Sequence, residues 1–399
     1  MIVSSLEYAK YAVLRASFTD PVAHGLTLGA TKAFYSIAFG LGPYFHEEIV
    51  NDMKNSWYTL LVDETTTDQN VKQFDMHARC WSRAEDRVVR KYVASNLFLG
   101  HARAGDLKTS IMEALSKDCL PLVKMLHLGC DGPNVNKSLK NQLNESIVQL
   151  GGKPLIDIGS CNLHVVHNGF HAGISSVDQS WGVEDLMSDL FTFFKKYSSR
   201  AEDFTVIQEA LNIEKKAFVS NLWMSVGPVC ERIIENWAGL TKYFLKTEHS
   251  APIKESSMYK RIATSLQEGN IMLARLHFIV SIANLFKPFL TKFQSESVSI
   301  HLLFEELAQV LRLLLQRFVK VDALKDKNGA QLLSVPLDSR PAQACEFGAH
   351  TLAVLKSLKK DSNPRLALLQ KEMIQFLKSS SSYLQQQRLP LKNEFLFNV

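Results

Sequence analysis

The chain has 399 residues, with 46% apolar and 21% charged side chains, which allows two or three globular domains and excludes a largely disordered protein. Its formal net charge of +5, from 45 basic and 40 acidic residues, is compatible with a nucleic-acid partner without requiring one. The six cysteines include no CxxC pair, which argues against a disulfide framework and favours a reducing intracellular compartment.

Residues 1–56 are predicted to be helical. Leu6, Ala9 and Val13 recur at helical spacing, and a second periodic segment covers 30–39. The sequence Gly-Leu-Gly-Pro at 40–43 is expected to break that segment, and an amphipathic helix should resume over 44–53. The first residues lack the basic, apolar and small-residue pattern of a signal peptide, so this region is expected to lead directly into the fold.

Residues 57–68, WYTLLVDETTTD, form the segment around which the rest is organised. The apolar run over 58–62 predicts a short strand covered on both faces, which stops at Asp63 and Glu64. The carboxyl ends of strands carry the ligand-binding groups of α/β sheets. Asp63 is therefore a candidate for the first carboxylate of a metal-dependent nuclease or transposase site; alternatively, it caps the turn that leaves the strand.

Further segments complete the predicted α/β region. Alternation over 74–80 indicates a strand with one polar face, and 88–98 returns from it through a turn at 82–86. A helix over 106–118 follows, and then an apolar strand over 124–130 that ends on Asp131. A helix over 134–150 and a fifth strand over 155–158 come last.

This order, three hairpin-linked strands and then two helix-linked strands, predicts a ribonuclease H-like mixed sheet in which the first and fourth strands are neighbours. Asp63 and Asp131 would then lie at matching carboxyl ends, about 4.8 Å apart by strand spacing. Two such carboxylates can share divalent cations, as phosphoryl-transfer sites do. Asp131 followed by Gly132 is by itself a common turn sequence, so the pair rather than either residue supports the prediction.

From about residue 175 no alternating strand pattern appears, and an all-helical domain is predicted. Its helices are expected at 183–197, 206–219, 226–247, 258–268, 271–293, 299–319, 342–358 and 364–377. Arg275, His277 and Lys287 interrupt the most apolar window, which predicts a buried helix rather than a membrane span. The predicted organisation is a helical region at 1–56, the ribonuclease H-like core at 57–174, a helical insertion at 175–390 and the start of a return to the core at 391–399.

Four motifs, LVDETTTD, LGCDGPNVNKSL, SCNLHVVH and LWMSVGPVCERIIENWAGL, occur in this order. Together they resemble the hAT superfamily of DNA transposases and their domesticated relatives, and the resemblance extends over nearly the whole chain. It implies an α/β plus α fold class, with a ribonuclease H-like mixed sheet interrupted by a large all-helical insertion domain. It also implies that Asp63 and Asp131 are the first two acids of an Asp-Asp-Glu triad that uses Mg²⁺ or Mn²⁺. Cys161 and His164 match the family's C-x2-H motif, and Trp223 matches its base-stacking tryptophan.

Three departures from the family pattern bear on activity. Leu222 stands where the family has an arginine before the tryptophan, which removes one phosphate or base contact. The third acid should follow the insertion, but the closing LKNEFLFNV offers only Glu394, and nothing around it marks it as that acid. The family's C-terminal dimerisation region and N-terminal BED-type zinc finger are expected to be missing. We therefore expect a catalytically impaired protein that performs no strand transfer by itself.

The histidine-rich segment has more than one interpretation. His164, His167 and His171 fall on one helix face, but structural zinc commonly takes four ligands with Cys-rich spacing, so zinc is the less favoured prediction. Cys161, His164 and His167 either help to place DNA or metal beside the aspartates, as the family implies, or are plain core residues. Trp223 likewise either stacks on an extruded base or packs between helices.

The functional prediction is a nuclear, hAT transposase-derived DNA-binding protein that contacts DNA through His164 and Trp223. Its alternative is a protein-interaction or regulatory module that keeps the fold without binding nucleic acid. No membrane partner is expected, and a protein partner or second copy of the chain would bind through the family's C-terminal region. If a glutamate completed the site, the reaction would be metal-assisted attack of water or a 3′-hydroxyl on a phosphodiester, with Asp63 and Asp131 as metal ligands.

Overall fold

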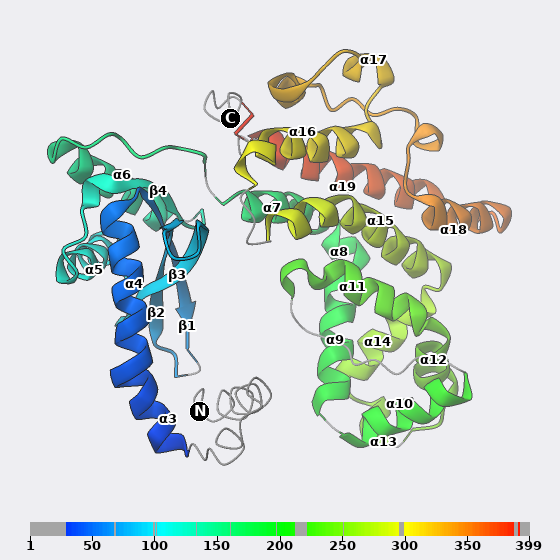
Figure 1. The fold of residues 1–399 in the computed structure, drawn as a ribbon. Helices are drawn as coiled ribbons and strands as arrows, with labels where there is room; N and C mark the ends of the chain where they lie inside the picture. Colours follow the sequence, from blue (N-terminus) through cyan, green and yellow to red (C-terminus); the bar gives the residue numbers. More distant parts are fainter. Residues whose placement is uncertain are drawn as a thin grey trace. The chain divides into compact units, whose positions relative to one another are not determined.

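The computed structural model describes residues 29–67, 69–98, 100, 102–132, 134–159, 161–196, 198–211, 222–249, 251–294, 299–386 and 390–391. The chain divides into two compact units, Met1–Asp157 and Ile158–Val399. The first contains a β-sheet and is called the sheet unit, and the second is called the helical unit (Figure 1).

The sheet unit contains a four-stranded mixed sheet among its described residues, in the order β3-β2-β1-β4 (Figure 1). Its strands are β1 (Tyr58–Thr66), β2 (Lys72–Ser82), β3 (Arg87–Phe98) and β4 (Met125–Gly129). β1 pairs with β2 and β2 pairs with β3 in antiparallel register, whereas β1 and β4 are parallel neighbours. The prediction that the first and fourth strands lie side by side is therefore confirmed.

Strand β1 is longer than the predicted strand, and only one of its two faces is fully buried. Its antiparallel pairing with β2 continues past Asp63 to Thr66, which lies opposite Lys72. Tyr58, Leu60 and Val62 are buried, the residues between them are half-buried, and the last four residues are exposed. The predicted stop at Asp63 was wrong, because pairing with β2 extends the strand and an apolar pattern does not report such pairing.

The sheet unit has six described helical elements, of which the last four share one apolar core with the buried face of the sheet. The six elements are α3 (Ala30–Ser36), the π-helix η1 (Ile37–Leu41), α4 (Gly42–Asn55), α5 (Ala104–Lys117), the 3₁₀-helix η2 (Leu122–Lys124) and α6 (Asn134–Gln149). The core takes Ile49 and Met53 from α4, Ile111 from α5 and Leu143 from α6. These helices agree with the predicted ones to within a few residues, apart from the segment before residue 29, which lies outside the described residues.

The predicted break at residues 40–43 is a π-helical turn that keeps α3, η1 and α4 in one continuous helical segment. The Gly42 amide donates to the Ile37 carbonyl across this turn. Pro43 follows directly after this turn as the second residue of α4, and it has no amide hydrogen to donate to the preceding turn. The wider turn therefore accommodates the proline without interrupting the helix.

The predicted fifth strand over 155–158 is wrong for the described residues, because this segment forms no ladder with β4. One backbone hydrogen bond, from Ile156 N to Leu126 O (2.8 Å), holds it beside β4. Side chains of α6 provide other contacts: Leu155 N donates to Asn144 Oδ1 (2.8 Å), and Lys140 Nζ lies 2.6 Å from Asp157 Oδ1. These α6 contacts position the segment without strand pairing.

The described part of the helical unit has no strand beyond one isolated bridge between Val319 and Ser339, as predicted. Its elements are α7 (Asn162–Ser175), α8 (Asp178–Trp181), α9 (Val183–Lys196), α10 (Ser198–Ala210), α11 (Leu222–Glu235), α12 (Trp237–Thr241), the π-helix η3 (Lys242–Lys246), α13 (Ala251–Lys254), α14 (Ser257–Gln267), α15 (Asn270–Phe293), α16 (Ile300–Gln316), α17 (Val321–Leu324), the 3₁₀-helices η4 (Gly329–Ser334) and η5 (Ala342–Ala344), α18 (Ala349–Lys360) and α19 (Leu366–Gln386).

Four predicted helices have different bounds in the structure, and one of them, predicted at 364–377, continues to Gln386. The helix predicted at 226–247 is interrupted at Asn236, whose side chain donates to the Arg232 carbonyl (2.9 Å) and accepts from Gln208 Nε2 (2.7 Å). An asparagine side chain that competes for backbone groups weakens a helix interior. The helix predicted at 206–219 begins earlier, at Ser198, and the one predicted at 342–358 begins later, at Ala349.

Helix α7 packs along α19 through two glycines. A Cβ on Gly169 would lie 2.6 Å from Leu384 Cδ2, and a Cβ on Gly173 would lie 2.5 Å from Phe376 Cε1. These contacts make α7 part of the helical unit, so the division falls between Asp157 and Ile158 rather than at the predicted 174/175. Sequence periodicity could not assign α7, because its partner helix is distant along the chain.

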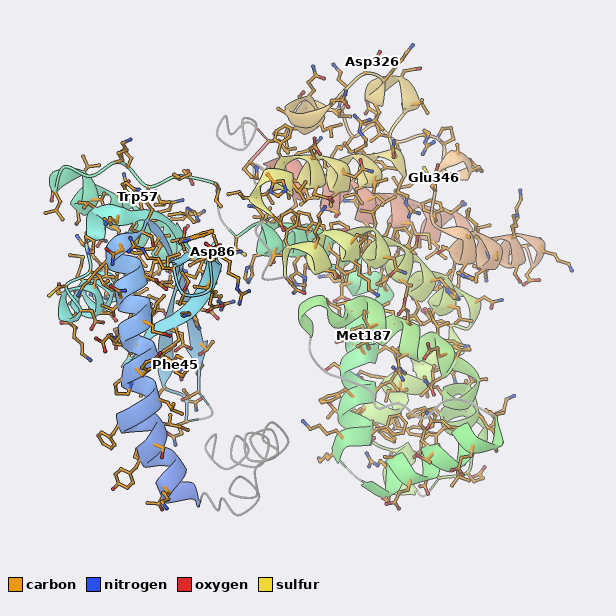
Figure 2. All side chains as sticks on the ribbon, in the orientation of Figure 1. Phe45, Trp57, Asp86, Met187, Asp326 and Glu346 are labelled. Atoms are coloured by element: carbon orange, nitrogen blue, oxygen red, sulfur yellow. The ribbon has the colours of Figure 1, made fainter. Side chains whose placement is uncertain are left out.

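Helix α15 lies in the core of the helical unit. Eleven of its residues are buried, which agrees with the predicted buried helix. Among the described helices it alone is long and apolar enough to cross a membrane, and half of its most apolar window is buried inside the protein. Met187 of α9 (labelled in Figure 2) is buried in the same apolar core.

Candidate functional site

Asp63 lies within β1, and Asp131 follows the end of the neighbouring strand β4 by two residues. In the parallel pair of β1 and β4, Leu61 lies opposite Gly129. Asp63 and Asp131 each follow two residues later, so continued parallel pairing would set them opposite each other, about 4.8 Å apart. Asp63 is exposed and makes no ion pair or hydrogen bond with another described residue, whereas Asp131 is half-buried. The parallel pairing therefore brings the chain segments that carry the two aspartates side by side.

Gly129 and Asn136 contact side chains near the carboxyl end of β4. A Cβ on Gly129 would lie 2.6 Å from Leu61 Cδ2, so a larger residue at this position of β4 would require the end of the Leu61 side chain to shift. The contact places Leu61 and residue 129 on the same side of the sheet, and period-two alternation along β1 predicts that Asp63 also points to that side. Asn136, in the first turn of α6, donates its side-chain amide to Asp131 Oδ1 and thereby orients the carboxylate.

A third carboxylate, Asp75 of β2, lies directly opposite Asp63. Gln73 Nε2 donates to both carboxylate oxygens of Asp75, at 2.9 and 3.0 Å. His77 follows on the same face: burial and the Arg90 charge lower its pKa, while Asp75 and Asp63 oppose that change. Alternation along 74–80 put Asp75 on the polar face, but it could not give the strand register. Sequence reasoning therefore missed Asp75 as a neighbour of Asp63.

The same face of the sheet carries arginine and aromatic side chains. Arg79 and Arg90 are register partners on β2 and β3, and Tyr92 lies opposite His77 with the ring centroids 5.7 Å apart. The Trp81 side chain is 46% exposed and that of Tyr92 is 54% exposed. Guanidinium groups pair with phosphates and aromatic rings stack on bases, so this surface suits a nucleic-acid strand.

The aspartate pair could hold Mg²⁺ only together with ligands from water and a substrate phosphate. Among the described residues, no group of three or more His, Cys, Asp or Glu side chains is arranged to hold a metal ion. Mg²⁺, however, commonly binds through one or two carboxylates together with waters and the phosphates of its substrate. Asp63 and Asp131 could supply the protein's share of such a site, and a nucleic-acid phosphate would complete it.

The C-x2-H motif lies at the start of α7, in the helical unit. Cys161 is the N-cap residue. Burial raises the pKa of the Cys161 thiol, but hydrogen bonds from the His164 side chain and from the Leu163 and His164 amides outweigh it and lower the pKa overall. His167 is buried, with its ring centroid 6.1 Å from that of His171. Burial and the two neighbouring histidines lower the pKa of His167.

Cys161 should react with iodoacetamide at a lower pH than an ordinary cysteine. Its lowered pKa populates the nucleophilic thiolate below the usual range, so the rate should rise through an apparent pKa below 9. His164→Gln removes the imidazole contribution and should move that pKa upward. Peptide-resolved mass spectrometry measures the rate, with the exposed Cys119 as internal reference. Superimposable pH profiles for the two proteins would contradict this account of the motif.

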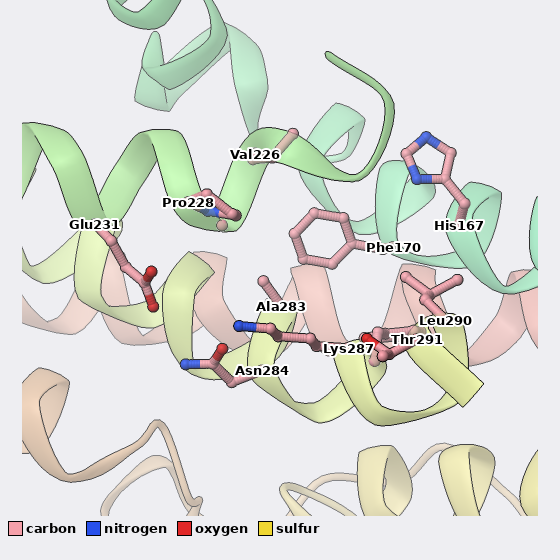
Figure 3. Close-up of a pocket in the computed structure, with 12 residues that line it drawn as sticks. His167, Phe170, Val226, Pro228, Glu231, Ala283, Asn284, Lys287, Leu290 and Thr291 are labelled. Carbon is pink, nitrogen blue, oxygen red and sulfur yellow. The ribbon is translucent and has the colours of Figure 1, made fainter. Parts of the chain in front are cut away.

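A cavity of about 150 Å³ lies between α7, α11 and α15 (Figure 3). Phe170 of α7 projects between the other two helices, and Glu231 of α11 and Lys287 of α15 also line the cavity. His167 is the lining residue from the C-x2-H segment. Trp223 is the second residue of α11, and its side chain lies outside the described residues. Its predicted stacking role stays a prediction.

No protein-family model matches the chain, and no curated protein matches it significantly. The hAT resemblance therefore depends on the sequence motifs. Of the predicted site residues, Asp63 and Asp131 belong to the sheet unit, whereas Cys161, His164, His167 and Trp223 belong to the helical unit.

Proposed function

We propose that the protein binds DNA and derives from a hAT transposase, with a ribonuclease H-like sheet unit followed by a helical insertion domain. The observation that supports this proposal is the parallel pairing of β1 with β4, because Asp63 and Asp131 each follow the last paired residues of these strands by two positions. Arg90 and Tyr92 on the same face add groups that bind phosphates and stack on bases. By the same resemblance, the protein would act in the nucleus, with His164 and Trp223 as further DNA contacts.

The aspartate pair would hold Mg²⁺ or Mn²⁺ against a DNA phosphate. A bound cation supplies charge neutralisation at that phosphate. Asn136 would keep Asp131 oriented for this role. No third acid is predicted, and Glu394, the only acid of the closing segment, lies outside the described residues. Two carboxylates leave most of the cation's coordination to water and DNA, so we propose DNA-dependent metal binding with impaired strand transfer.

Binding of duplex DNA should weaken steeply as the salt concentration rises, because each phosphate contact releases condensed counterions. Arg90→Gln should weaken binding to all sequences and reduce the slope of log affinity against log salt by about 1. Arg87→Gln is the matched control: it lies on the same strand, on the opposite face, and its guanidinium is already paired with Glu85 at 3.0 Å. Fluorescence anisotropy over a series of salt concentrations measures both slopes.

A protein-interaction module is the second candidate, because α3, η1 and α4 carry exposed aromatic side chains. Phe39 is 73% exposed and Tyr44 is 58% exposed, with Phe34, Tyr35 and Phe45 (labelled in Figure 2) similarly exposed. A contiguous exposed apolar surface usually marks a protein interaction site. Absent or salt-independent DNA binding, with equal slopes for the Arg90 and Arg87 variants, would favour this candidate over DNA binding.

A further inference from the structure

A second hollow of about 710 Å³ lies in the helical unit, between α15, α16 and the beginning of α18. His277 and Ser281 line it from α15, Arg317 lies at the end of α16, and Glu346 (labelled in Figure 2) precedes α18. His277 stacks on His350, with ring centroids 5.4 Å apart and an interplanar angle of 23°. This hollow is distinct from the aspartate pair, and it shares only the lining residue Asn284 with the cavity beside His167.

The N-terminus of α18 opens into this hollow. Gly348 is the N-cap residue, so no side chain caps the helix, and Ala349, His350 and Thr351 of the first turn all line the hollow. The first amides of a helix lack intrahelical partners and, with the helix dipole, attract anions. Gly348 has φ +96°, and a Cβ there would overlap Ser281 Oγ, so glycine is what allows this helix end to approach α15.

The second observation is a buried hydroxyl group without a partner. Thr351 is 0% exposed, and its Oγ1 has no hydrogen-bond partner among the described residues. A buried hydroxyl is normally hydrogen-bonded, and a bound ligand can supply the missing partner at a binding site. A ligand oxygen at the end of α18 would supply that partner.

Arg317 supplies the positive charge. Its Nη1 donates to Ser281 Oγ (3.2 Å) and to the Glu346 carbonyl (3.4 Å), so its guanidinium is held at the hollow by a hydroxyl and a main-chain oxygen. Burial lowers the pKa of Arg317 and the nearby Glu346 carboxylate opposes that change, but an arginine side chain stays charged in either case. Leu285 and Leu313 give the same hollow an apolar wall.

We propose that this hollow binds a small organic phosphate, with its phosphate group at the N-terminus of α18 against Thr351 and Arg317 and its organic part against the apolar wall. Fixed amide dipoles and a guanidinium group favour a compact dianion. The Glu346 side chain also lines the hollow, and its negative charge disfavours a long polyanion such as duplex DNA. The site therefore adds to the proposed DNA-binding function and does not depend on it.

Calorimetric titration of the full chain with inorganic phosphate and with phenyl phosphate, at constant ionic strength, tests the proposal. Both should bind saturably, with phenyl phosphate the tighter of the two. Thr351→Val keeps the side-chain shape and removes a hydroxyl that has no protein partner, so the melting temperature should not fall while phosphate affinity drops about tenfold. Arg317→Lys should also weaken binding, because it loses the planar guanidinium. Lys356→Gln, an exposed charge change further along α18, is the control and should bind as the wild type does.

Absence of saturable phosphate binding by the wild-type protein would overturn the proposal. Wild-type phosphate affinity in both the Thr351→Val and Arg317→Lys proteins would also overturn it. If duplex DNA displaced phosphate and phenyl phosphate bound no better than phosphate, the assignment to a small organic ligand would fail. DNA binding by the Thr351→Val protein should be unchanged, which separates this test from that of the proposed function.

Discussion

Replacing Glu268 with glutamine is expected to lower the free energy of unfolding of the helical unit by about 3 kcal/mol. Arg275 is only 2% exposed, and its guanidinium pairs with Glu268. Glu268 also accepts a hydrogen bond from Arg365 Nη2 (2.8 Å). The glutamine variant therefore leaves the buried Arg275 guanidinium without its counter-charge and within the field of the Arg365 charge. Glu372 offsets part of the cost, because its charge also acts on Arg275.

A double substitution tests whether the stability is lost because the buried Arg275 charge is unpaired or because Glu268 loses its contacts. Arg275→Met combined with Glu268→Gln should recover most of the lost stability, because an apolar side chain of similar length tolerates burial without a counter-charge. Glu202→Gln, on the exposed surface of α10, is the control and should change the free energy of unfolding by less than about 0.5 kcal/mol. Native-state hydrogen exchange measures stability within the helical unit. A Glu268→Gln protein with wild-type protection would contradict the prediction.

Gly173→Val is expected to destabilise the helical unit by about 3 kcal/mol, at the upper end of the cost of overpacking a core. A Cβ at this position would meet three Phe376 ring carbons at 2.5 to 2.8 Å. The ring cannot move aside easily, because Phe376 is 0% exposed and contacts Trp181, Phe170 and Phe278. The protection of α7 and α19 amides against hydrogen exchange should therefore fall together.

A smaller pair of substitutions tests whether this contact is the cause. Gly173→Ala and Phe376→Leu should each destabilise the protein, and the double variant should lose less than the sum because the shorter side chain makes room for the methyl group. Gly105→Ala in α5, where a Cβ would meet nothing within 4 Å, should instead be neutral or stabilising by about 0.5 kcal/mol. Strictly additive losses at Gly173 and Phe376 would show that the two side chains do not compete for space.

The pairing of β1 with β4 could be predicted from the sequence because it follows from two apolar runs and their connections. Each aspartate ends a run, and a helix-linked strand returns beside the first strand by general rules of topology. Asp75 could not be predicted as their neighbour, because the register of β2 against β1 depends on the exact length of the hairpin. The extension of β1 to Thr66 could not be predicted either, because it depends on pairing with β2 and the added residues are polar.

Contacts between distant segments limited the prediction of the helical unit. Periodicity identified α9, α14, α15 and α16, since each has its own apolar stripe. It could not assign α7, because the glycines of α7 make room for Leu384 and Phe376 of α19, which is distant along the chain. The hollow beside α18 was missed for a similar reason: Ser281, Arg317 and Thr351 come from three separate elements, and none of them is unusual where it stands in the sequence.

The proposal that Asp63 and Asp131 form one cation site is tested most directly by Mn²⁺ binding in the presence of duplex DNA. We predict saturable Mn²⁺ binding that is stronger with DNA than without it. Asp63→Asn and Asp131→Asn should each remove most of the affinity, and the double variant should lose little more than either single one, because a shared ion can be lost only once. Glu113→Gln, an exposed carboxylate on α5, should bind Mn²⁺ as the wild type does. Mn²⁺ affinity that neither aspartate substitution changes, or losses that simply add, would contradict the proposal.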